Sequence, residues 1–149
     1  MIQEIECYEL KRIPCNDFVV KFEFEDLNGN KYLIQFKNDS IGPIDKPMIG
    51  TSYELTYFVW DEDSSTWSIS KIVSSNIFRL MNTIFAEAVP MFLQERTWVK
   101  KLRFEGLAKD NEKEFITQRT KVYLRYLKNN PIAGYKTTSC ANCINLSKG

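Results

Sequence analysis

Histidine is absent from this chain of 149 residues, so no mechanism that needs a histidine of its own is open to it. A Ser–His or Cys–His nucleophile pair and a His-ligated metal are both excluded. An excess of charge of one sign is lacking too, because 20 Lys and Arg residues oppose 19 Asp and Glu residues. The net charge of +1 gives no global electrostatic reason to expect a nucleic acid or an anionic membrane as partner.

Targeting signals and long apolar runs are also lacking. The first six residues, MIQEIE, are acidic and do not resemble a secretory signal. The longest apolar region, residues 77–93, is interrupted by Arg79, Asn82, Glu87 and Pro90, which makes it too polar for a membrane span. Without a signal, four cysteines are expected to be free thiols. The sequence therefore predicts a cytoplasmic protein with no membrane partner.

Aromatic residues are plentiful, at 13% of the chain, and the first half alternates apolar with polar residues. Residues 18–25 and 32–37 alternate with the period of a half-buried strand. Asn28-Gly29 between them is a strong signal for a tight hairpin turn, because both residues accept positive φ. These segments predict the first hairpin.

A second hairpin is predicted after a loop rich in Gly and Pro at residues 38–52. Its strands are residues 53–60 and 67–73, joined by the polar turn 61–66. An earlier strand over residues 4–13 is expected to join the same sheet.

The apolar period changes from two to between three and four after residue 76, which predicts a helix over residues 77–92. Pro90 lies inside this pattern and is expected to kink the helix or to end it a turn early. Residues 98–107 read as another strand. A second helix is expected from Asp110 to residue 128, and residues 134–138 as a last short strand.

Together these patterns predict an α+β fold, with a mainly antiparallel sheet of about six strands and two helices packed on one face. The expected order is strand, hairpin, hairpin, helix, strand, helix, strand. The stretch 67–107 is compatible with a right-handed crossover, which would make its two strands parallel. Residues 1–138 are expected to form a single domain, followed by a polar C-terminal tail over residues 139–149.

Cys140 and Cys143 form the one motif of known chemistry. A CxxC spacing lets two thiolates hold one metal ion, or lets one thiol resolve a disulfide on the other. Zinc would need two more ligands, and the spacing of Cys7 and Cys15 fits no standard zinc knuckle. We interpret the pair as free thiols on the tail, with a metal site as the alternative.

Two further features are candidate contacts for an anion or a protein partner. Arg119 is expected to share a helix face with Phe115 and Tyr123, where its guanidinium could bind a phosphate or carboxylate. We favour the alternative that its stem packs along Tyr123. Phe58 and Trp60 could form a stacking platform, but we favour their burial under helices on the second face of the sheet. The acidic turn 61–63 is interpreted as solvated.

The segment 67–135 resembles small uncharacterised phage and bacterial proteins and, distantly, the C-terminal half of the GNAT family of N-acetyltransferases. In that family an antiparallel sheet leads to a helix, a parallel strand, a helix with an aliphatic-Tyr pair, and a Gly-Phe step. Val122-Tyr123 and Gly134-Tyr135 stand at the matching positions.

The resemblance implies an acyl-CoA site with Ser74, Ser75, Asn76 and Arg79 at the phosphate turn, and Glu105 and Tyr123 as catalytic groups. However, residues 73–79 contain none of the glycines that let the family's backbone approach the pyrophosphate. We therefore expect a non-enzymatic binding or accessory domain that needs no cofactor and acts through contacts with a protein partner or with itself. An acyl-CoA-dependent N-acetyltransferase with an atypical or degenerate cofactor turn is the alternative. Nucleic acid is not expected as a partner.

Overall fold

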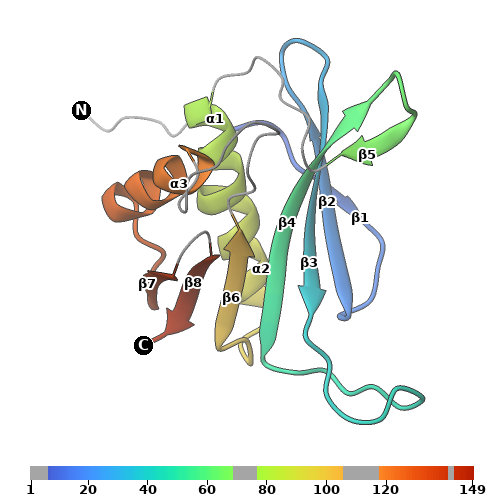
Figure 1. Ribbon diagram of the computed structural model, residues 1–149, viewed down its shortest axis with the longest axis vertical. Helices are drawn as coiled ribbons and strands as arrows, with labels where there is room; N and C mark the ends of the chain where they lie inside the picture. Colours follow the sequence, from blue (N-terminus) through green and yellow to red (C-terminus); the bar gives the residue numbers. More distant parts are fainter. Residues whose placement is uncertain (1–6, 69–76, 106–117, 141–142) are drawn as a thin grey trace.

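A computed structural model describes residues 7–68, 77–105, 118–140 and 143–149 of the chain (Figure 1). The first half contains the strands β1 (Lys11–Ile13), β2 (Val19–Glu25), β3 (Lys31–Asn38), β4 (Ser52–Asp61) and β5 (Thr66–Ser68). The second half contains a helix built from α1 (Ile77–Met81), η1 (Asn82–Ala88) and α2 (Val89–Glu95), then β6 (Lys101–Glu105), α3 (Gln118–Asn129), β7 (Tyr135–Cys140) and β8 (Cys143–Lys148).

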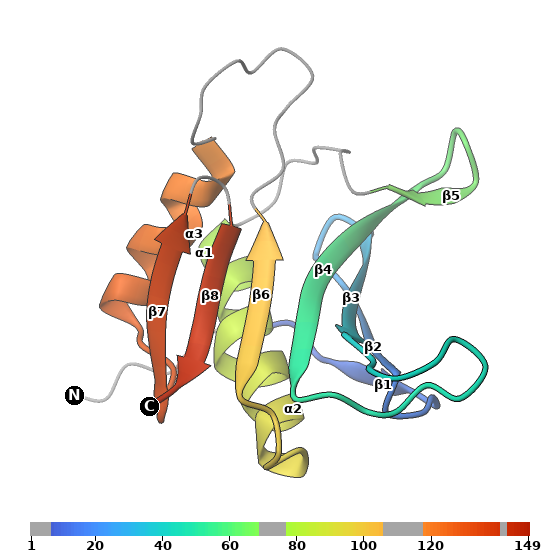
Figure 2. The ribbon, with the colours of Figure 1, turned by 60° about the horizontal axis from the view of Figure 1, so that its bottom comes forward.

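The strands form one mixed sheet of eight, in the order β1-β2-β3-β4-β6-β8-β7, with β5 paired to β4 (Figure 2). The α+β class is confirmed, but the expected size of about six strands is too small. All pairings in this sheet are antiparallel except that of β4 with β6. The parallel partner of β6 is β4, and not the returning strand of the second hairpin as the sequence suggested. β5 pairs with Val59–Asp61 at one end of β4, whereas β6 pairs with Ser52–Glu54 at the other end, and residues 69–73 of the predicted returning strand lie outside the described residues.

The first hairpin turns at Asn28-Gly29 as predicted, but Gly29 alone has a positive φ there, at +84°, and the strand pairing ends at Glu25 and Lys31, so the connection is longer than the expected tight turn. The buried Asp26 carboxylate holds this turn together. It accepts hydrogen bonds from the Asn28 and Asn30 backbone N–H groups, both at 2.9 Å, from the Asn30 side chain at 2.9 Å, and from the Tyr32 hydroxyl at 3.0 Å. Burial raises the pKa of the Asp26 carboxyl, but the hydrogen bonds from Asn30, Tyr32 and Asn28 outweigh it and leave the pKa below its ordinary value.

The first helix neither ends at Pro90 nor a turn before it, and continues to Glu95. The segment before the proline is π-helical, as shown by the Val89 N–H donating to the carbonyl of Ile84, five residues earlier. Proline has no N–H to donate and its ring would crowd the carbonyl four residues earlier in a regular α-helix. A wider turn just upstream shifts the hydrogen-bond ladder, which lets the helix accommodate Pro90.

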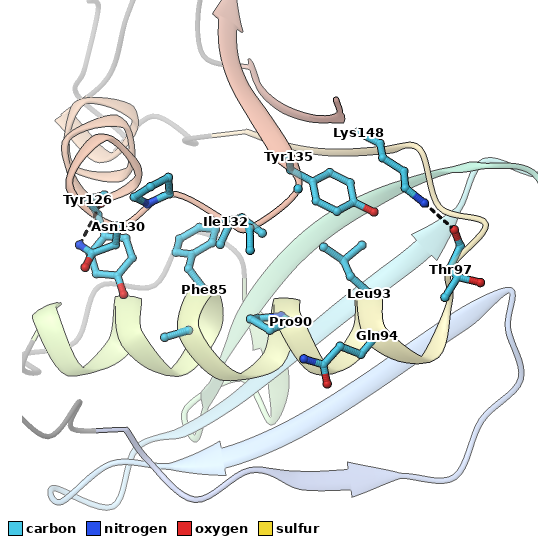
Figure 3. Close-up of a pocket in the computed structure, with 14 residues that line it drawn as sticks. Phe85, Pro90, Leu93, Gln94, Thr97, Tyr126, Asn130, Ile132, Tyr135 and Lys148 are labelled. Atoms are coloured by element: carbon cyan, nitrogen blue, oxygen red, sulfur yellow. Dashed lines mark hydrogen bonds between the residues drawn. The ribbon is translucent and has the colours of Figure 1, made fainter.

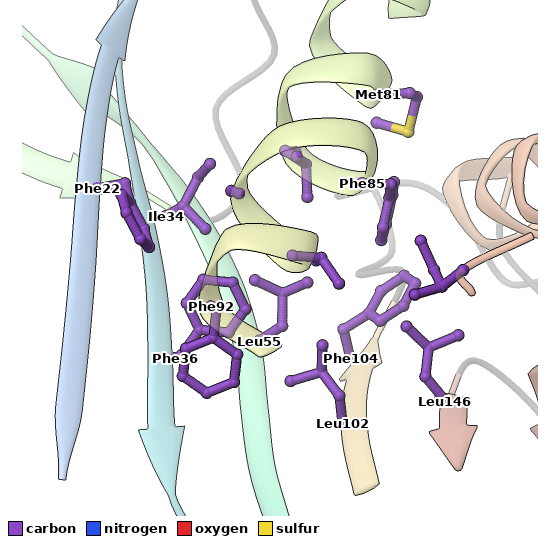
Figure 4. Close-up of a cluster of buried hydrophobic side chains, with 14 of the residues drawn as sticks. Phe22, Ile34, Phe36, Leu55, Met81, Phe85, Phe92, Leu102, Phe104 and Leu146 are labelled. Atoms are coloured by element: carbon purple, nitrogen blue, oxygen red, sulfur yellow. The ribbon is translucent and has the colours of Figure 1, made fainter. Parts of the chain in front are cut away.

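One apolar core lies between the sheet and the helices (Figure 4). Phe92 of α2 is fully buried, its ring stacked on Phe36 at 4.1 Å and edge-on to Tyr53 at 4.8 Å. In the second half, Phe85 contacts Phe104 at 5.1 Å between centroids. The alternating aromatics of the first half and the apolar stripe of the helix thus meet in a single core, as their periods predict.

The predicted polar tail is wrong as a structural description, because Tyr135–Cys140 and Cys143–Lys148 are β7 and β8. Ile144 and Leu146 of β8 are fully buried in the core. Only these two residues of the segment are strongly apolar, which gives too short an alternation to predict a strand from sequence. Their burial depends on β8 lying between β6 and β7, and that is a long-range pairing. In the part of the chain that the structure describes, no helix has the length and apolar character needed to span a membrane.

Candidate functional site: an aromatic groove on the open face

Both helices cover the same face of the sheet and leave the other face open in the described parts of the chain (Figures 1 and 2). One helix connects β4 to β6, and α3 follows β6 and leads to β7, so both crossings move in the same direction along the sheet. Right-handed crossings in one direction place both helices on one face.

Phe58 and Trp60 point to the open face, because they alternate along β4 with the buried Leu55 and Val59. The expectation that helices bury them is therefore wrong. Phe58 lies beside Leu33 of β3. Both Phe58 and Trp60 are half-buried.

A pair of tryptophans forms the aromatic part of this face. Trp60 and Trp67 are direct partners in the β4–β5 hairpin, and their rings lie edge to face with centroids 5.3 Å apart and planes at 72°. They border a groove of about 810 Å³. The groove is lined by Glu9, Leu10, Lys11, Glu23, Phe24, Glu25, Lys31, Tyr32, Trp60 and Trp67.

Charged side chains of both signs form the rim of this aromatic groove. Lys11 is the strand partner of Glu23, and Lys31 is the partner of Glu25, so each cation lies opposite a carboxylate. The groove thus combines an aromatic wall with lysine donors and glutamate acceptors. Each of these charged groups could bind a group of a ligand in place of the residue opposite it. Its volume of about 810 Å³ lies in the range typical of ligand pockets.

A second groove, of about 570 Å³, runs between α2 and the segment that follows α3 (Figure 3). Its lining includes Phe85, Pro90, Leu93, Tyr126, Ile132 and Tyr135. The polar groups here serve the fold itself: the Tyr135 hydroxyl donates to the Val99 carbonyl at 2.8 Å, and Lys148 Nζ donates to the Thr97 carbonyl at 2.9 Å. The groove on the open face is therefore the better candidate for a binding site.

Tyr126 borders the second groove but points its hydroxyl into the core. The hydroxyl donates to Asn82 Oδ1 at 2.5 Å. Burial, with a smaller effect of Cys7, raises the pKa of Tyr126 to about 12. The neutral hydroxyl is thus favoured in the fold, and Tyr126 is no general base near neutral pH.

The residues implied by the acetyltransferase resemblance are only partly placed. Ser74, Ser75 and Asn76 lie outside the described residues. Arg79 donates to the carbonyl of Cys7 at 3.2 Å, and its guanidinium lies over the Tyr8 ring at 4.6 Å, so it fastens the N-terminal segment to the helix.

For Glu105 and Arg119 the structure gives the place of the backbone in the fold but does not describe the side chain. Glu105 ends β6 and Arg119 lies in the first turn of α3. The expected packing of Arg119 along Tyr123 stays a prediction.

Tyr123 is buried and contacts the ring of Phe104 at 5.6 Å between centroids. Its hydroxyl donates to the hydroxyl of Tyr57 on β4 at 3.1 Å. This bond spans the region where β4 and β6 separate, since the two strands pair only from Ser52 to Glu54 (Figure 2). Tyr123 lines neither of the two grooves described above.

Cys140 and Cys143 are strand partners at the end of the β7–β8 hairpin. No cluster of three or more Cys, Asp or Glu ligands occurs among the residues with described positions. Cys7 is half-buried beside Arg79, and Cys15 is exposed beyond β1.

From the sequence, Trp60 was singled out as a candidate contact, but neither its pairing with Trp67 nor the charged rim was predicted. The signal was present, because two tryptophans flank the polar turn 61–66 at positions that a hairpin brings together. The rim depends on the register of β1, β2 and β3, which alternation alone does not fix. Comparison with protein-family models, with curated proteins and with solved structures found no match for this chain.

Proposed function

We propose that this protein is a non-enzymatic binding domain that holds a segment of another protein in the aromatic groove on its open face. The single observation that carries the proposal is the Trp60–Trp67 pair, half-buried at the wall of a groove of about 810 Å³. Tryptophan is enriched, with tyrosine and arginine, among the few residues that dominate binding energy at protein interfaces.

The composition of the groove also suggests what kind of segment it takes. An apolar side chain of the partner would pack against the two indole rings and remove them from water. Flanking residues of either charge would meet Glu23, Glu25, Lys11 or Lys31 at the rim. Rim contacts of this kind add specificity and speed of association more than affinity.

Affinity capture from the source cells tests the proposal. The wild-type chain, Trp60→Ala, Trp67→Ala and the control Trp98→Ala would be compared as baits. Trp98 is 39% exposed and does not line the groove. We expect a partner that wild type and Trp98→Ala retain and that both groove variants lose. The affinity of each groove variant for this partner, once identified, is expected to be lower by about tenfold or more.

Two outcomes would contradict the proposal. One is a set of captured proteins that is the same for all four baits. The other is equal affinity of Trp60→Ala and wild type for a purified partner. Circular dichroism of each variant establishes that a lost partner does not reflect unfolding.

An acyl-CoA-dependent acetyltransferase is the second candidate, favoured by the strand arrangement around Tyr123. β4 and β6 are parallel, are connected through a helix, and diverge after three paired residues, with the Tyr123 hydroxyl at the divergence. In this reading Tyr123 would supply a proton to a thiolate leaving group. Against it, Phe104 and Tyr57 already contact Tyr123, so the hydroxyl faces no groove described here.

Titration with acetyl-CoA while following the melting temperature separates the two candidates. The binding-domain proposal predicts no shift at millimolar acetyl-CoA. A saturable increase that Tyr123→Phe leaves in place, with transfer activity lost, would favour the acetyltransferase.

A further inference from the structure

The β7–β8 hairpin brings two thiols together at the edge of the sheet. Cys140 is the last residue of β7 and Cys143 the first of β8, and the two are direct partners in the antiparallel register. Side chains of directly opposed residues lie on the same face of a sheet. Cys140 is exposed and Cys143 half-buried, so reagents in solution can reach the pair.

The separation of the two residues follows from the hydrogen-bond phase of the hairpin. The Gly149 N–H donates to the Gly134 carbonyl at 3.1 Å, which makes that opposed pair a hydrogen-bonded one. Hydrogen-bonded and non-hydrogen-bonded pairs alternate along an antiparallel ladder, so every second pair is of the same kind. Cys140 is six residues after Gly134, and its pair with Cys143 is therefore also a hydrogen-bonded one. Such pairs have Cα atoms about 5.5 Å apart. That separation lies inside the range of about 4.4–6.8 Å that a disulfide spans.

The other cysteines lack this arrangement. Neither Cys7 nor Cys15 is opposed to another cysteine in the described sheet. Burial, reinforced by the charge of Glu87 and partly offset by Arg79, also raises the pKa of the Cys7 thiol. At a given pH, a smaller fraction of Cys7 is therefore present as the reactive thiolate.

We propose that Cys140 and Cys143 are a reversible thiol–disulfide site that the folded hairpin holds ready to close. The Cys140 thiolate attacks a low-molecular-weight disulfide such as oxidised glutathione, and one glutathione thiolate leaves. The Cys143 thiolate then attacks the Cys140 sulfur of the mixed disulfide and releases the second glutathione. Two protein thiols are oxidised, one external disulfide is reduced to two thiols, and two protons leave the protein.

A defined glutathione redox buffer tests the site on the full chain. After acid quenching and alkylation, trypsin releases residues 137–148, which contain both cysteines and neither of the others. This peptide is expected to be lighter by two hydrogen atoms and to carry no alkyl group, while Cys7 and Cys15 are alkylated. The same equilibrium measured in denaturant is expected to favour the disulfide at least about tenfold less, because the unfolded chain does not hold the thiols together.

Single variants give the matched controls. Cys140→Ser and Cys143→Ser are each expected to stop at a mixed disulfide with glutathione on the remaining thiol, whereas Cys15→Ser closes like wild type. The proposal is overturned if folded and denatured chains close equally, if Cys140 and Cys143 stay alkylated in the oxidising buffer, or if the disulfide joins two copies of the chain.

Discussion

The two halves of this protein share one core but differ in charge. Residues 1–68 contain 13 Asp and Glu residues against 6 Lys and Arg, whereas residues 69–149 contain 6 against 14. A net charge of +1 therefore conceals an acidic half and a basic half. Global neutrality therefore says little about the charge of the surface that a partner meets.

Ion pairs cross the boundary between the halves. Arg103 of β6 lies 3.2 Å from Glu54 and 3.7 Å from Asp39, and Arg96 lies 3.0 Å from Asp17. In these pairs the cation belongs to the basic half and the carboxylate to the acidic half. The apolar core joins the halves as well, and these two kinds of contact differ greatly in expected energy.

Removing Phe92 tests whether the halves fold as one unit. Phe92→Ala takes a fully buried ring away from Phe36 and Tyr53 of the acidic half and is expected to cost about 3–5 kcal/mol. Unfolding in urea, followed by fluorescence and circular dichroism, should still show a single transition. Val122→Ala, at a side chain 38% exposed, serves as control and should change the free energy of unfolding by less than about 0.5 kcal/mol. Separate transitions for the two probes would show that the halves fold independently.

Asp26→Asn removes hydrogen bonds that lie wholly within the acidic half. The amide keeps the shape but loses the charge, and its NH₂ group faces donors, so a loss of about 2 kcal/mol is expected. The lowered pKa of Asp26 means that its contribution is present above the ordinary value of 3.8 and is lost as pH falls through the folded value. Urea titrations at several acidic pH values should show a smaller decline for Asp26→Asn than for wild type. An equal decline would mean that Asp26 is not a source of the acid sensitivity.

Tyr126 provides the corresponding alkaline test in the basic half. Its folded pKa of about 12 exceeds the ordinary value of 10.0, so the stability it contributes is complete below pH 10 and is lost as pH rises towards 12. Tyr126→Phe removes the hydroxyl that donates to Asn82 and is expected to cost about 1–2 kcal/mol at pH 7. The free energy of unfolding of this variant should fall less than that of wild type between pH 10 and 12. Parallel curves would show that Tyr126 does not titrate with folding.

The ion pair between the halves should give the smallest effect. The Arg103 and Glu54 side chains are 35% and 47% exposed, so a double-mutant cycle of Arg103→Ala and Glu54→Ala is expected to give a coupling below about 1 kcal/mol. The coupling should shrink further as salt is added. A coupling that is larger and independent of salt would mean that charge, and not only the core, holds the halves together.

Local patterns predicted much of the fold. The Asn28-Gly29 turn lies between β2 and β3, and the apolar stripe after residue 76 is a helix. The effect of Pro90 could not be predicted in the same way. The sequence shows where proline interrupts the α-helical hydrogen bonds, but not that a π-helical segment before it lets the helix continue. The candidate site could be predicted only in part. Alternation along the strand predicts the sheet face on which Trp60 lies, whereas the exposure of that face depends on where the helices pack.

The sequence by itself determined the short-range features: strand alternation, the hairpin turns, the helical stripe, and the absence of histidine chemistry. These follow from backbone preferences and side-chain period, which act over a few residues. Tertiary structure alone decided that β6 pairs with β4, that β8 lies between β6 and β7, and that both helices cover one face. Those choices depend on the handedness of crossovers and on burying residues such as Ile144 and Leu146 against partners distant in the chain. The pairing of Trp60 with Trp67 and that of Cys140 with Cys143 are intermediate between short-range and tertiary features, since each requires only that a hairpin forms.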